Sequence, residues 1–396
     1  MKRLLVLAAG PLQIPIIRRA RELGYYVIAA DGNPKAQGLR IADKPVVVDI
    51  CSEEEMLAVA RQEGINGVIH PCSEVSMIVM GRINDELGLH GISREAALRA
   101  TNKHLMRRAF EDFGAPGPKS FCTDNPEEGF SLFRSFNGRA ILKPSRNSGS
   151  RGVAAIEPDI GLESFRTLFD RSKSESRDKS VMVEEFVDGP EFSVEIIVWD
   201  GMIHVLQVTD KKTTGVPYFI ELGHSQPSLF CSEVLSAVRD AAVKGVKALR
   251  LNDCAVHAEV KYQKDKAYLM EIGARLGGDY ISTVLTRLST GIDMVAAAID
   301  VAMGIHPNLD SIAESSGVAI RYFTPAPGQV VSIECTDLLE RPDVYDAELY
   351  VGPGDFVNEV KSSLDRSGHV IVTAPTAQDA AEIAESLIKG VKIITV

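Results

Sequence analysis

Residues 254–272 read CAVHAEVKYQKDKAYLMEI, and this stretch has the pattern of a β-hairpin. Its first arm alternates polar and apolar residues, so that His257, Glu259 and Lys261 share one face of a predicted strand. The apolar residues between and before them occupy the other face: Val256, Ala258 and Val260. The polar tetrapeptide at 263–266 predicts the turn that leads into the second arm. The hairpin therefore has one face for a core and one face that carries polar chemistry.

Two glutamates of this hairpin form a candidate metal site. If Glu259 pairs with Glu271, their Cβ atoms lie about 5 Å apart, and two facing carboxylates repel unless a cation lies between them. Hard oxygen ligands of this kind suit Mg²⁺, which is held by one or two carboxylates together with substrate phosphates. A register shift by one residue would move one carboxylate to the opposite face and leave two solvated glutamates instead. The apolar strand around Glu271 and the run GARLGGD at 273–279 favour the metal site.

A second segment has the features of a phosphate-binding loop. Residues 141–153 read ILKPSRNSGSRGV, in which a strand carrying Lys143 leads into a loop of small polar residues. Such loops let backbone N–H groups approach phosphate oxygens, and the lysine adds a positive charge. The segment is not a Walker loop, because the dipeptide Gly-Lys does not occur in the chain. The alternative is an ordinary β-hairpin with a solvated tip.

Two further segments carry polar residues next to strands. Residues 181–195, VMVEEFVDGPEFSVE, join two strands through a Gly-Pro turn. Main-chain groups there could bind an adenine edge, and Glu191 could accept hydrogen bonds from ribose hydroxyls; the alternative is a charged turn. Residues 209–228 form a long polar insert that contains Lys211 and His224 and is typical of a loop that contacts substrate. A solvated loop is the competing interpretation of this insert.

The rest of the chain predicts an α/β region followed by α+β regions. Apolar strands and amphipathic helices alternate over about the first hundred residues, which predicts a doubly wound parallel sheet. Its expected strands are 3–9, 26–30, 46–49 and 67–71, with helices at 14–23 and 53–63. Beyond residue 104 we expect an α+β region, with a helix at 161–171 and an exposed polar loop at 172–179. A small terminal unit has expected strands at 330–335, 357–361 and 369–373 and a helix at 377–388.

Composition and charge exclude several classes of function. The chain of 396 residues has 43 basic and 54 acidic residues and a net charge of −11, which argues against a nucleic acid or an anionic membrane as its main partner. No apolar run approaches the roughly 18–20 residues that span a bilayer. The apolar N-terminus predicts a buried strand rather than a signal peptide, because Gly10 and Pro11 interrupt it early. No C-x-x-C pair occurs among the six cysteines. We therefore expect a cytoplasmic protein.

Taken together and in this order, the segments resemble the ATP-grasp superfamily of carboxylate–amine ligases, with a layout similar to biotin carboxylase and carbamoyl-phosphate synthetase. The resemblance implies a pre-ATP-grasp domain over 1–102 and an ATP-grasp domain over 103–327, with a mobile lid lobe at about 116–187. It also implies a C-terminal α+β domain over 328–396. The residues that match its ATP site are Lys103, Lys143, Ser148, Gly149, Ser150, Gly152, Glu184, Glu185, Val187 and Glu191. Glu259 and Glu271 match the carboxylates that bind Mg²⁺, with Mn²⁺ as a substitute.

Within the superfamily, the run RLGGD at 275–279 and the insert at 209–228 look most like the L-amino-acid ligases. This resemblance implies that Mg-ATP activates a small-molecule carboxylate as an acyl phosphate, which then couples to a small-molecule amine. The matching catalytic residues are Lys143, Arg275 and His257, and the matching substrate residues are Lys211, His224, Gly277, Gly278 and Asp279. His257 could equally be a satisfied, half-buried histidine. The family often has Asn where Gly273 stands, so one metal-ligand oxygen must come from water or another group.

Other functions are compatible with the same residues. One is an ATP-grasp ligase of a phosphoribosyl or sugar-acid substrate, and a phosphoribosyl group would need a basic pocket, for which Arg275 and Arg321 are candidates. Another is a non-catalytic nucleotide-binding protein, although such a sensor needs no paired metal carboxylates. An apolar sheet edge would also allow a homodimer.

Overall fold

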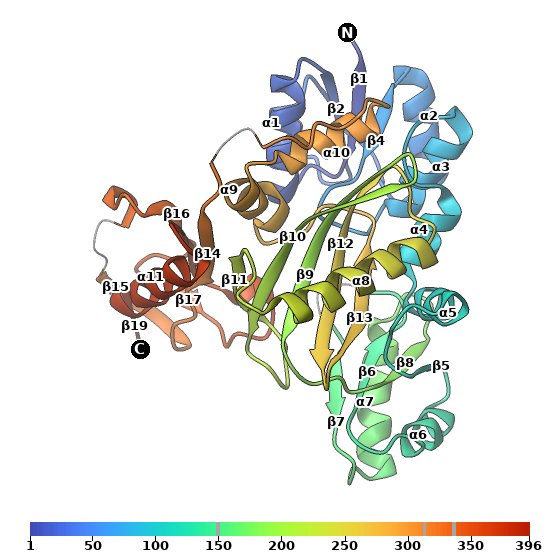
Figure 1. Ribbon diagram of the computed structural model, residues 1–396, viewed down its shortest axis with the longest axis vertical. Coiled ribbons are helices and arrows are strands. Elements are labelled where there is room, and N and C mark those ends of the chain that lie inside the picture. The colour runs from blue at the N-terminus through green and yellow to red at the C-terminus, as the bar shows by residue number, and fades with distance from the viewer. Residues whose placement is uncertain (148–150, 312–313, 335–337) are drawn as a thin grey trace.

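The computed structural model describes residues 1–147, 151–311, 314–334 and 338–396. The predicted loop residues Ser148, Gly149 and Ser150 lie outside the described residues. Within these ranges the chain forms four β-sheets. In Figure 1 the N-terminal sheet lies at the top, a small antiparallel sheet at the bottom and the C-terminal strands at the left, around a large central sheet. The expected combination of α/β and α+β architecture is confirmed.

The N-terminal region forms the expected parallel sheet, with the strand order β3-β2-β1-β4. Its strands are β1 (Arg3–Leu7), β2 (Tyr26–Asp31), β3 (Lys44–Val47) and β4 (Gly67–Ile69), and its helices are α1 (Ile14–Glu22), α2 (Glu53–Glu63), α3 (Met77–Leu87) and α4 (Arg94–Thr101). Successive residues of the central strand β1 belong to two different cores, one on each face of the sheet. The residues that follow β4, His70 and Pro71, lie against the hairpin near Cys254 and Arg275.

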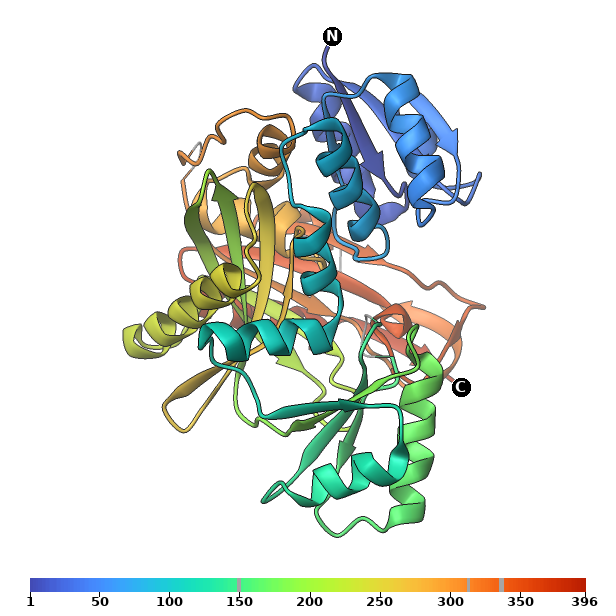
Figure 2. The same cartoon turned by 90° about the vertical axis from the view of Figure 1, so that its right-hand side faces the viewer.

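A small antiparallel sheet with the order β5-β8-β6-β7 forms a separate lobe. Its strands are β5 (Ser120–Thr123), β6 (Ala140–Pro144), β7 (Ala154–Ile156) and β8 (Val181–Glu185). Helices α6 (Pro126–Arg134) and α7 (Leu162–Glu175) pack on it through Phe133, Phe165 and Phe169. Helix α5 (Lys103–Phe113) precedes the lobe, which projects at the bottom of both Figure 1 and Figure 2. These elements fall where the sequence predicts a lid lobe.

The large sheet has eight strands in the order β13-β12-β9-β10-β11-β14-β18-β16. Its first five strands in the chain are β9 (Glu191–Trp199), β10 (Met202–Thr213), β11 (Glu221–Gln226), β12 (Cys254–Gln263) and β13 (Lys266–Gly273). Helix α8 (Ser232–Ala248) packs on one face, where Val256, Ala258 and Val260 belong to the core. Helix α10 (Met294–Ala302) packs on the other face and also contacts α1 and β4. Helix α10 thus connects the two main sheets, and helix α9 (Thr286–Thr290) covers β10 and β14 further along the large sheet.

The C-terminal strands do not form an isolated sheet. Strands β14 (Gly317–Tyr322), β18 (Gly368–Ala374) and β16 (Val344–Leu349) continue the large sheet, and helix α11 (Ala377–Gly390) packs on β14 and β18. Strands β15 (Gly328–Glu334), β17 (Phe356–Val357) and β19 (Lys392–Thr395) form a three-stranded sheet beside it. The strand predicted at 357–361 is shorter than expected, because only Gly328 and Gln329 pair with it. Across the described ranges, the helices are too short or too polar to cross a membrane.

Two predicted loops are instead regular structure. Helix α7 continues to Glu175, and Ser172 and Ser176 of the predicted exposed loop are buried. Strands β10 and β11 account for most of the insert at 209–228 and leave residues 214–220 and 227–228 outside the strands. Both differences have one cause, because polar residues in a sequence indicate solvent exposure. In β10 and β11 polar residues such as Lys211 and Glu221 line a cavity instead.

Candidate active site

The paired carboxylates of the hairpin are present. Glu259 of β12 lies directly opposite Glu271 of β13, in the register that the sequence predicted. A bulge follows at once, because Val260 pairs with Leu269 and Met270 is left without an opposite residue. The side chains of both glutamates line one cavity of about 210 Å³. Hairpin geometry alone therefore brings two carboxylates to one wall of a cavity.

This cavity gathers side chains from several parts of the chain. Lys143 and Val153 come from the small sheet, Val187 and Glu191 from the segment that enters the large sheet, and Arg275 from the end of the hairpin. Among the predicted nucleotide residues, Lys143, Val187, Glu191, Glu259 and Glu271 thus share one wall. Phe186 and Phe219 add aromatic surface to it. The cavity has an apolar part for a planar ring and a charged part for phosphates.

The two predicted phosphate-binding lysines lie beside carboxylates. Lys103 opens helix α5, and its Nζ lies 3.1 Å from Oε1 of Glu271 and donates to the carbonyl oxygen of Asn147 at 2.8 Å. Burial alone would lower the pKa of Lys103, but Glu271 and Glu74 raise it. For Lys143, burial lowers the pKa in spite of Glu184, whose Oε2 lies 2.6 Å from its Nζ. The two lysines therefore differ in how firmly they hold a proton.

Glu184, predicted in the adenine hinge, has its carboxylate fully engaged. The Arg107 Nε and Nη2 atoms donate to it at 2.9 and 3.2 Å, and Lys143 completes a buried cluster. Burial would raise the pKa of Glu184, but Arg107 and Lys143 lower it, so the group stays ionised. Its side chain has no room for a ligand. Main-chain atoms of the hinge and the side chains of Phe186 and Val187 are left to meet an adenine, while Glu185 is exposed.

A second cavity, of about 180 Å³, adjoins the first. The two share Lys211, Glu221, Glu259 and Arg275. Lys211 lies at their boundary, with Nζ 2.6 Å from Glu191, 3.1 Å from Glu259 and 3.7 Å from Glu221. Burial would lower the pKa of Lys211, but these three carboxylates raise it well above its usual value. The same lysine, with His257, holds the pKa of Glu259 well below its usual range against the effect of burial.

His257 lines the second cavity, and the buried Glu195 holds its ring in place. Its Nδ1 lies 2.5 Å from Oε1 of Glu195, a fully buried carboxylate that also accepts a hydrogen bond from Ser282. Burial would lower the pKa of His257, but Glu195 raises it to about 9. At neutral pH His257 is therefore a cation paired with Glu195. Gly277 lies so close that an added Cβ would come within 2.6 Å of the His257 Nδ1, which explains the glycine.

The predicted substrate residues His224 and Asp279 lie side by side. The His224 Nε2 is 3.3 Å from Oδ2 of Asp279, and both residues line the second cavity together with Gly278. Asp279 has φ +50°, an uncommon left-handed conformation for a residue other than glycine. Arg366 binds its carboxylate in a bidentate pair. Burial would raise the pKa of Asp279, but Arg366 and His224 lower it strongly.

Four charged residues of this region were not anticipated from the sequence: Glu74, Arg107, Glu195 and Arg366. Glu74 lies in the larger cavity, with Oε1 3.2 Å from Nη2 of Arg275. Burial and the nearby Glu271 raise the pKa of Glu74. Its position just beyond the carboxyl end of β4 was the available signal, because ligands of parallel α/β sheets bind at that edge. The other three offered none, since each is an isolated charge in an ordinary helix, strand or loop.

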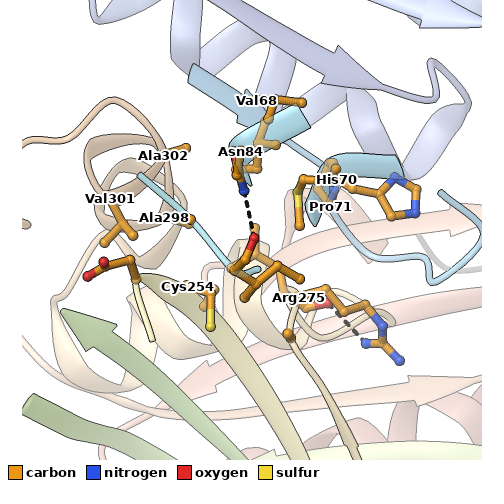
Figure 3. A pocket seen from close by; sticks show the side chains of 17 residues that line it. Val68, His70, Pro71, Asn84, Cys254, Arg275, Ala298, Val301 and Ala302 are labelled. Carbon is orange, nitrogen blue, oxygen red and sulfur yellow. Dashed lines mark hydrogen bonds between the residues drawn. The ribbon is translucent and has the colours of Figure 1, made fainter. Parts of the chain in front are cut away.

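A smaller cavity of about 30 Å³ lies behind the site, between the two main sheets. Figure 3 shows Arg275 on one side of it and Val301 and Ala302 of α10 on the other. The Asn84 Nδ2 donates to the carbonyl oxygen of Ile92 at 3.0 Å. Its wall is largely apolar, so it belongs to the packing between the sheets. It contributes to the site only by supporting Arg275, whose Nη1 donates to the carbonyl oxygen of Leu276 at 3.0 Å.

The donor set fits a divalent cation shared with a phosphate. Across the described residues, no three or more His, Cys, Asp or Glu side chains come together as a metal site. The pair Glu259 and Glu271 supplies hard oxygen donors, and two lysines, Lys211 and Lys103, occupy positions next to them. This matches Mg²⁺, which takes one or two carboxylates and completes its shell with phosphates and water. It does not match a cation that needs a closed protein cage.

Comparisons with known proteins agree with this geometry. The family model "ATP-grasp domain" matches residues 137–284, and "L-amino acid ligase C-terminal domain 2" matches residues 321–396. The chain is 28% identical over 268 residues to the alanine–anticapsin ligase of Bacillus subtilis (strain 168), covering 63% of this chain and 56% of that protein. The first curated relatives are longer, and the chain spans between 56% and 65% of their length.

Solved structures share the fold over the whole chain. The L-amino acid ligase from Bacillus licheniformis superposes with a TM-score of 0.84 at 19% identity, covering 100% of this chain and 99% of that one. The phosphoribosylglycinamide synthetase from Anaerococcus prevotii gives 0.79 at 22% identity, with both chains fully covered. At these identities the likeness concerns the fold. The chain thus carries an ATP-grasp domain followed by an L-amino acid ligase C-terminal domain, and it is L-amino-acid-ligase-like in this arrangement.

Proposed function

We propose that this protein is an ATP-dependent ligase that joins the carboxylate of one amino acid to the amine of another, releasing ADP and phosphate. The observation that carries the proposal is the position of the Glu259–Glu271 pair. It lies in a cavity suited to a nucleotide, and Glu259 also lines the adjoining polar cavity. A phosphate held at this pair would therefore lie next to a small molecule in the second cavity.

The proposed reaction has two steps. A carboxylate oxygen of the first substrate attacks the γ-phosphorus of ATP, the bond from that phosphorus to ADP breaks, and an acyl phosphate forms. The amine of the second substrate then attacks the acyl carbon, inorganic phosphate leaves, and the nitrogen loses a proton. Mg²⁺ bound by Glu259 and Glu271, or Mn²⁺ in its place, would supply positive charge at the phosphates.

The chain's own cations have assigned roles in this proposal. Lys103 and Lys143 neutralise charge on the phosphates, and Arg275, in both cavities, stabilises the oxyanion that forms at the acyl carbon. His257 contributes a fixed positive charge on the substrate side, held by Glu195. The lobe that carries Lys143 acts as the lid over ATP and excludes water from the acyl phosphate.

A phosphoribosyl substrate is less well supported. It would need unpaired cations for its phosphate, and the sequence offers Arg275 and Arg321. Arg321 is committed elsewhere, because it contacts Glu385 at 2.7 Å, the His224 carbonyl oxygen at 3.0 Å and the Ser225 hydroxyl at 3.2 Å. Arg275, which pairs with Glu74, is already assigned to the oxyanion at the acyl carbon and is not left for a second phosphate. The second cavity therefore suits an amino acid better than a sugar phosphate.

The test is the release of ADP and phosphate from Mg-ATP across a matrix of amino acids, singly and in pairs. We expect release to require two amino acids together and to fall about 100-fold or more in Glu271→Gln, since that change would remove a carboxylate that holds the cation beside the phosphates. The matched control is Glu111→Gln, on the exposed face of α5. If no pair supports release while a sugar acid or a phosphoribosyl amine does, the amino-acid assignment is wrong.

A further inference from the structure

The second cavity is lined mainly by polar residues. Among the described residues that line it, Ile281 is the only apolar side chain. The remainder are two histidines, several charged side chains, the hydroxyl-bearing Ser193 and Ser363, and a glycine. A bound aliphatic or aromatic side chain would bury less apolar than polar surface of the protein and would desolvate polar groups without replacing their hydrogen bonds. The wall therefore disfavours large apolar ligands.

The charges in this wall are of both signs. Lys211 and Arg275 supply positive charge, and Glu221 and Asp279 supply negative charge. Each already has a partner of opposite sign or a hydroxyl donor; Ser363, for instance, donates to Glu221 at 3.0 Å. A ligand with a net charge would leave one of these pairs unbalanced, whereas a zwitterion brings one group for each sign. The cavity is therefore matched to a compound with both an ammonium and a carboxylate group.

Some polar atoms of the wall residues have spare hydrogen-bonding capacity. The Ser193 hydroxyl and the His224 Nδ1 are buried and have no hydrogen-bond partner among the described residues. Buried polar atoms without a partner are uncommon because each costs free energy. Here two of them belong to side chains that line one small cavity. Both atoms are enclosed by protein and are not exposed to the cavity, so a ligand meets them only if these side chains rotate.

Arg366, in the C-terminal region, holds two residues that line the second cavity. The Arg366 Nη1 and Nη2 donate to the two carboxylate oxygens of Asp279 at 2.7 and 2.8 Å. The guanidinium group lies over the ring of Tyr322 at 3.7 Å from its centre, and Nη1 also reaches the carbonyl oxygen of Glu221 at 3.3 Å. Its side chain is only 9% exposed. Arg366 therefore holds Asp279 and the backbone at Glu221 in one arrangement.

We propose that the second cavity binds a compact amino acid with a hydrogen-bonding side chain, such as a hydroxyl or a carboxamide, and that Arg366 is a positioning residue for it. The inference rests on the proposed ligase function and adds the class of substrate. Arg366 acts through Asp279 and does not itself line the cavity. Its contribution is to keep the Asp279 carboxylate where a polar side chain meets it.

Isosteric amino acids test the substrate class. Thr against Val and Asn against Leu differ mainly in hydrogen bonding, so we measure kcat/KM for ADP release with each, at saturating Mg-ATP and a fixed second amino acid. The polar member of each pair should be at least about tenfold better, because a site built for hydrogen bonds rejects the analogue that lacks them. Equal or higher values for Val and Leu would overturn this inference and leave the ligase function intact. Release with no amino acid at all would overturn both.

Variants of Arg366 test its positioning role. Arg366→Ala should raise the KM for the amino acid about tenfold or more, with little change in kcat or in the KM for ATP, and Arg366→Lys should restore part of the loss. The matched control is Arg341→Ala, which removes an exposed arginine that pairs with Asp343 in the same region. Asp279→Asn, which keeps the shape of the pair, should reproduce the KM effect if Arg366→Ala does not fold. An amino-acid KM that matches the control in both variants would refute the role.

Discussion

Two clusters of the same residue types lie within one site, and they differ in what surrounds them. In the first, Glu184 is enclosed by Arg107 and Lys143, and its side chain is 1% exposed. In the second, Glu259 and Glu271 face a cavity beside Lys211 and Lys103, and their side chains are 29% and 24% exposed. A glutamate next to a lysine thus stabilises the fold in one place and is available to a ligand in the other.

The difference arises from the number of partners. Glu184 accepts from three nitrogen atoms of two cations, which occupy both of its oxygens. Glu259 and Glu271 each have a lysine on one oxygen, Oε1, so a second cation can reach the pair. A closed cluster cannot accept a ligand without breaking. An open cluster gives up part of the stabilisation that ion pairs provide and keeps carboxylate oxygens available to a ligand.

The closed cluster is best broken at Arg107. Arg107→Ala leaves Glu184 buried with Lys143 alone, and removal of one partner from a buried charge network typically costs about 3–5 kcal/mol. We expect a loss of unfolding free energy of that size in urea titration. Arg108→Ala, which changes the exposed neighbour on the same helix, is the control. Equal stability of the two variants would show that Glu184 is not held as the geometry implies.

The open cluster should respond in the opposite way. Glu259→Gln should reduce ADP release about 100-fold or more, because Mg²⁺ beside the γ-phosphate would lose one of its two carboxylate ligands. Its unfolding free energy should fall by less than that of Arg107→Ala, since Lys211 keeps Glu191 and Glu221 as partners. Turnover and urea unfolding measured on the same preparation separate the two effects. A large loss of stability with normal turnover would reverse the assignment of the clusters.

The sequence predicted the open cluster and missed the closed one for a physical reason. Glu259 and Glu271 are joined by a tight turn, so local alternation fixes which residues face each other. Arg107 and Glu184 are separated by 77 residues, and nothing local in either segment indicates the pair. The same holds for Arg366 and Asp279, which are 87 residues apart.

The parallel sheet was predicted for a similar reason, because its burial pattern is local. Errors occurred where polar residues lie in regular structure. Lys211 and His224 were expected in a loop and lie in β10 and β11, since their side chains face a cavity rather than solvent. A single sequence does not distinguish these two surroundings.

His70, near Arg275, differs from both clusters because it is a buried titratable group that stays neutral. Burial lowers its pKa from 6.5 to about 4, and its Nδ1 lies 3.1 Å from the carbonyl oxygen of Leu7. Between these two pH values the unfolded chain binds a proton that the folded protein does not, so stability rises with pH and is lost as the pH falls from 6.5 towards 4.

The contribution of His70 amounts to roughly 2–3 kcal/mol over this window. Urea titrations at several pH values should show a smaller pH dependence in His70→Gln than in the parent protein. His306→Gln, which changes an exposed histidine, should keep the parental slope. A parental slope in His70→Gln would mean that other groups cause the loss at low pH.

Exposed ion pairs form a third class and should contribute least to the free energy of unfolding. Arg94 donates two hydrogen bonds to Glu53, yet its side chain is 45% exposed. Water screens such pairs, and they typically contribute about 1 kcal/mol or less. Arg94→Ala should therefore shift the urea midpoint only slightly, and less so at high salt. A loss as large as that of Arg107→Ala would show that geometry rather than burial decides the strength of these pairs.

The strand order of the large sheet has a consequence for synthesis on the ribosome. The hairpin of β12 and β13 can pair as soon as both arms have emerged, whereas β11 pairs with β14 and β14 with β18, across long stretches of chain. Until residue 374 is translated, β14 lacks its second neighbour and presents an open edge. The carboxylate pair is thus assembled early, while the arm that carries Arg366 joins it among the last elements. A nascent chain halted before residue 366 would hold the carboxylate pair that we propose for metal binding without Arg366, which we propose to position the substrate.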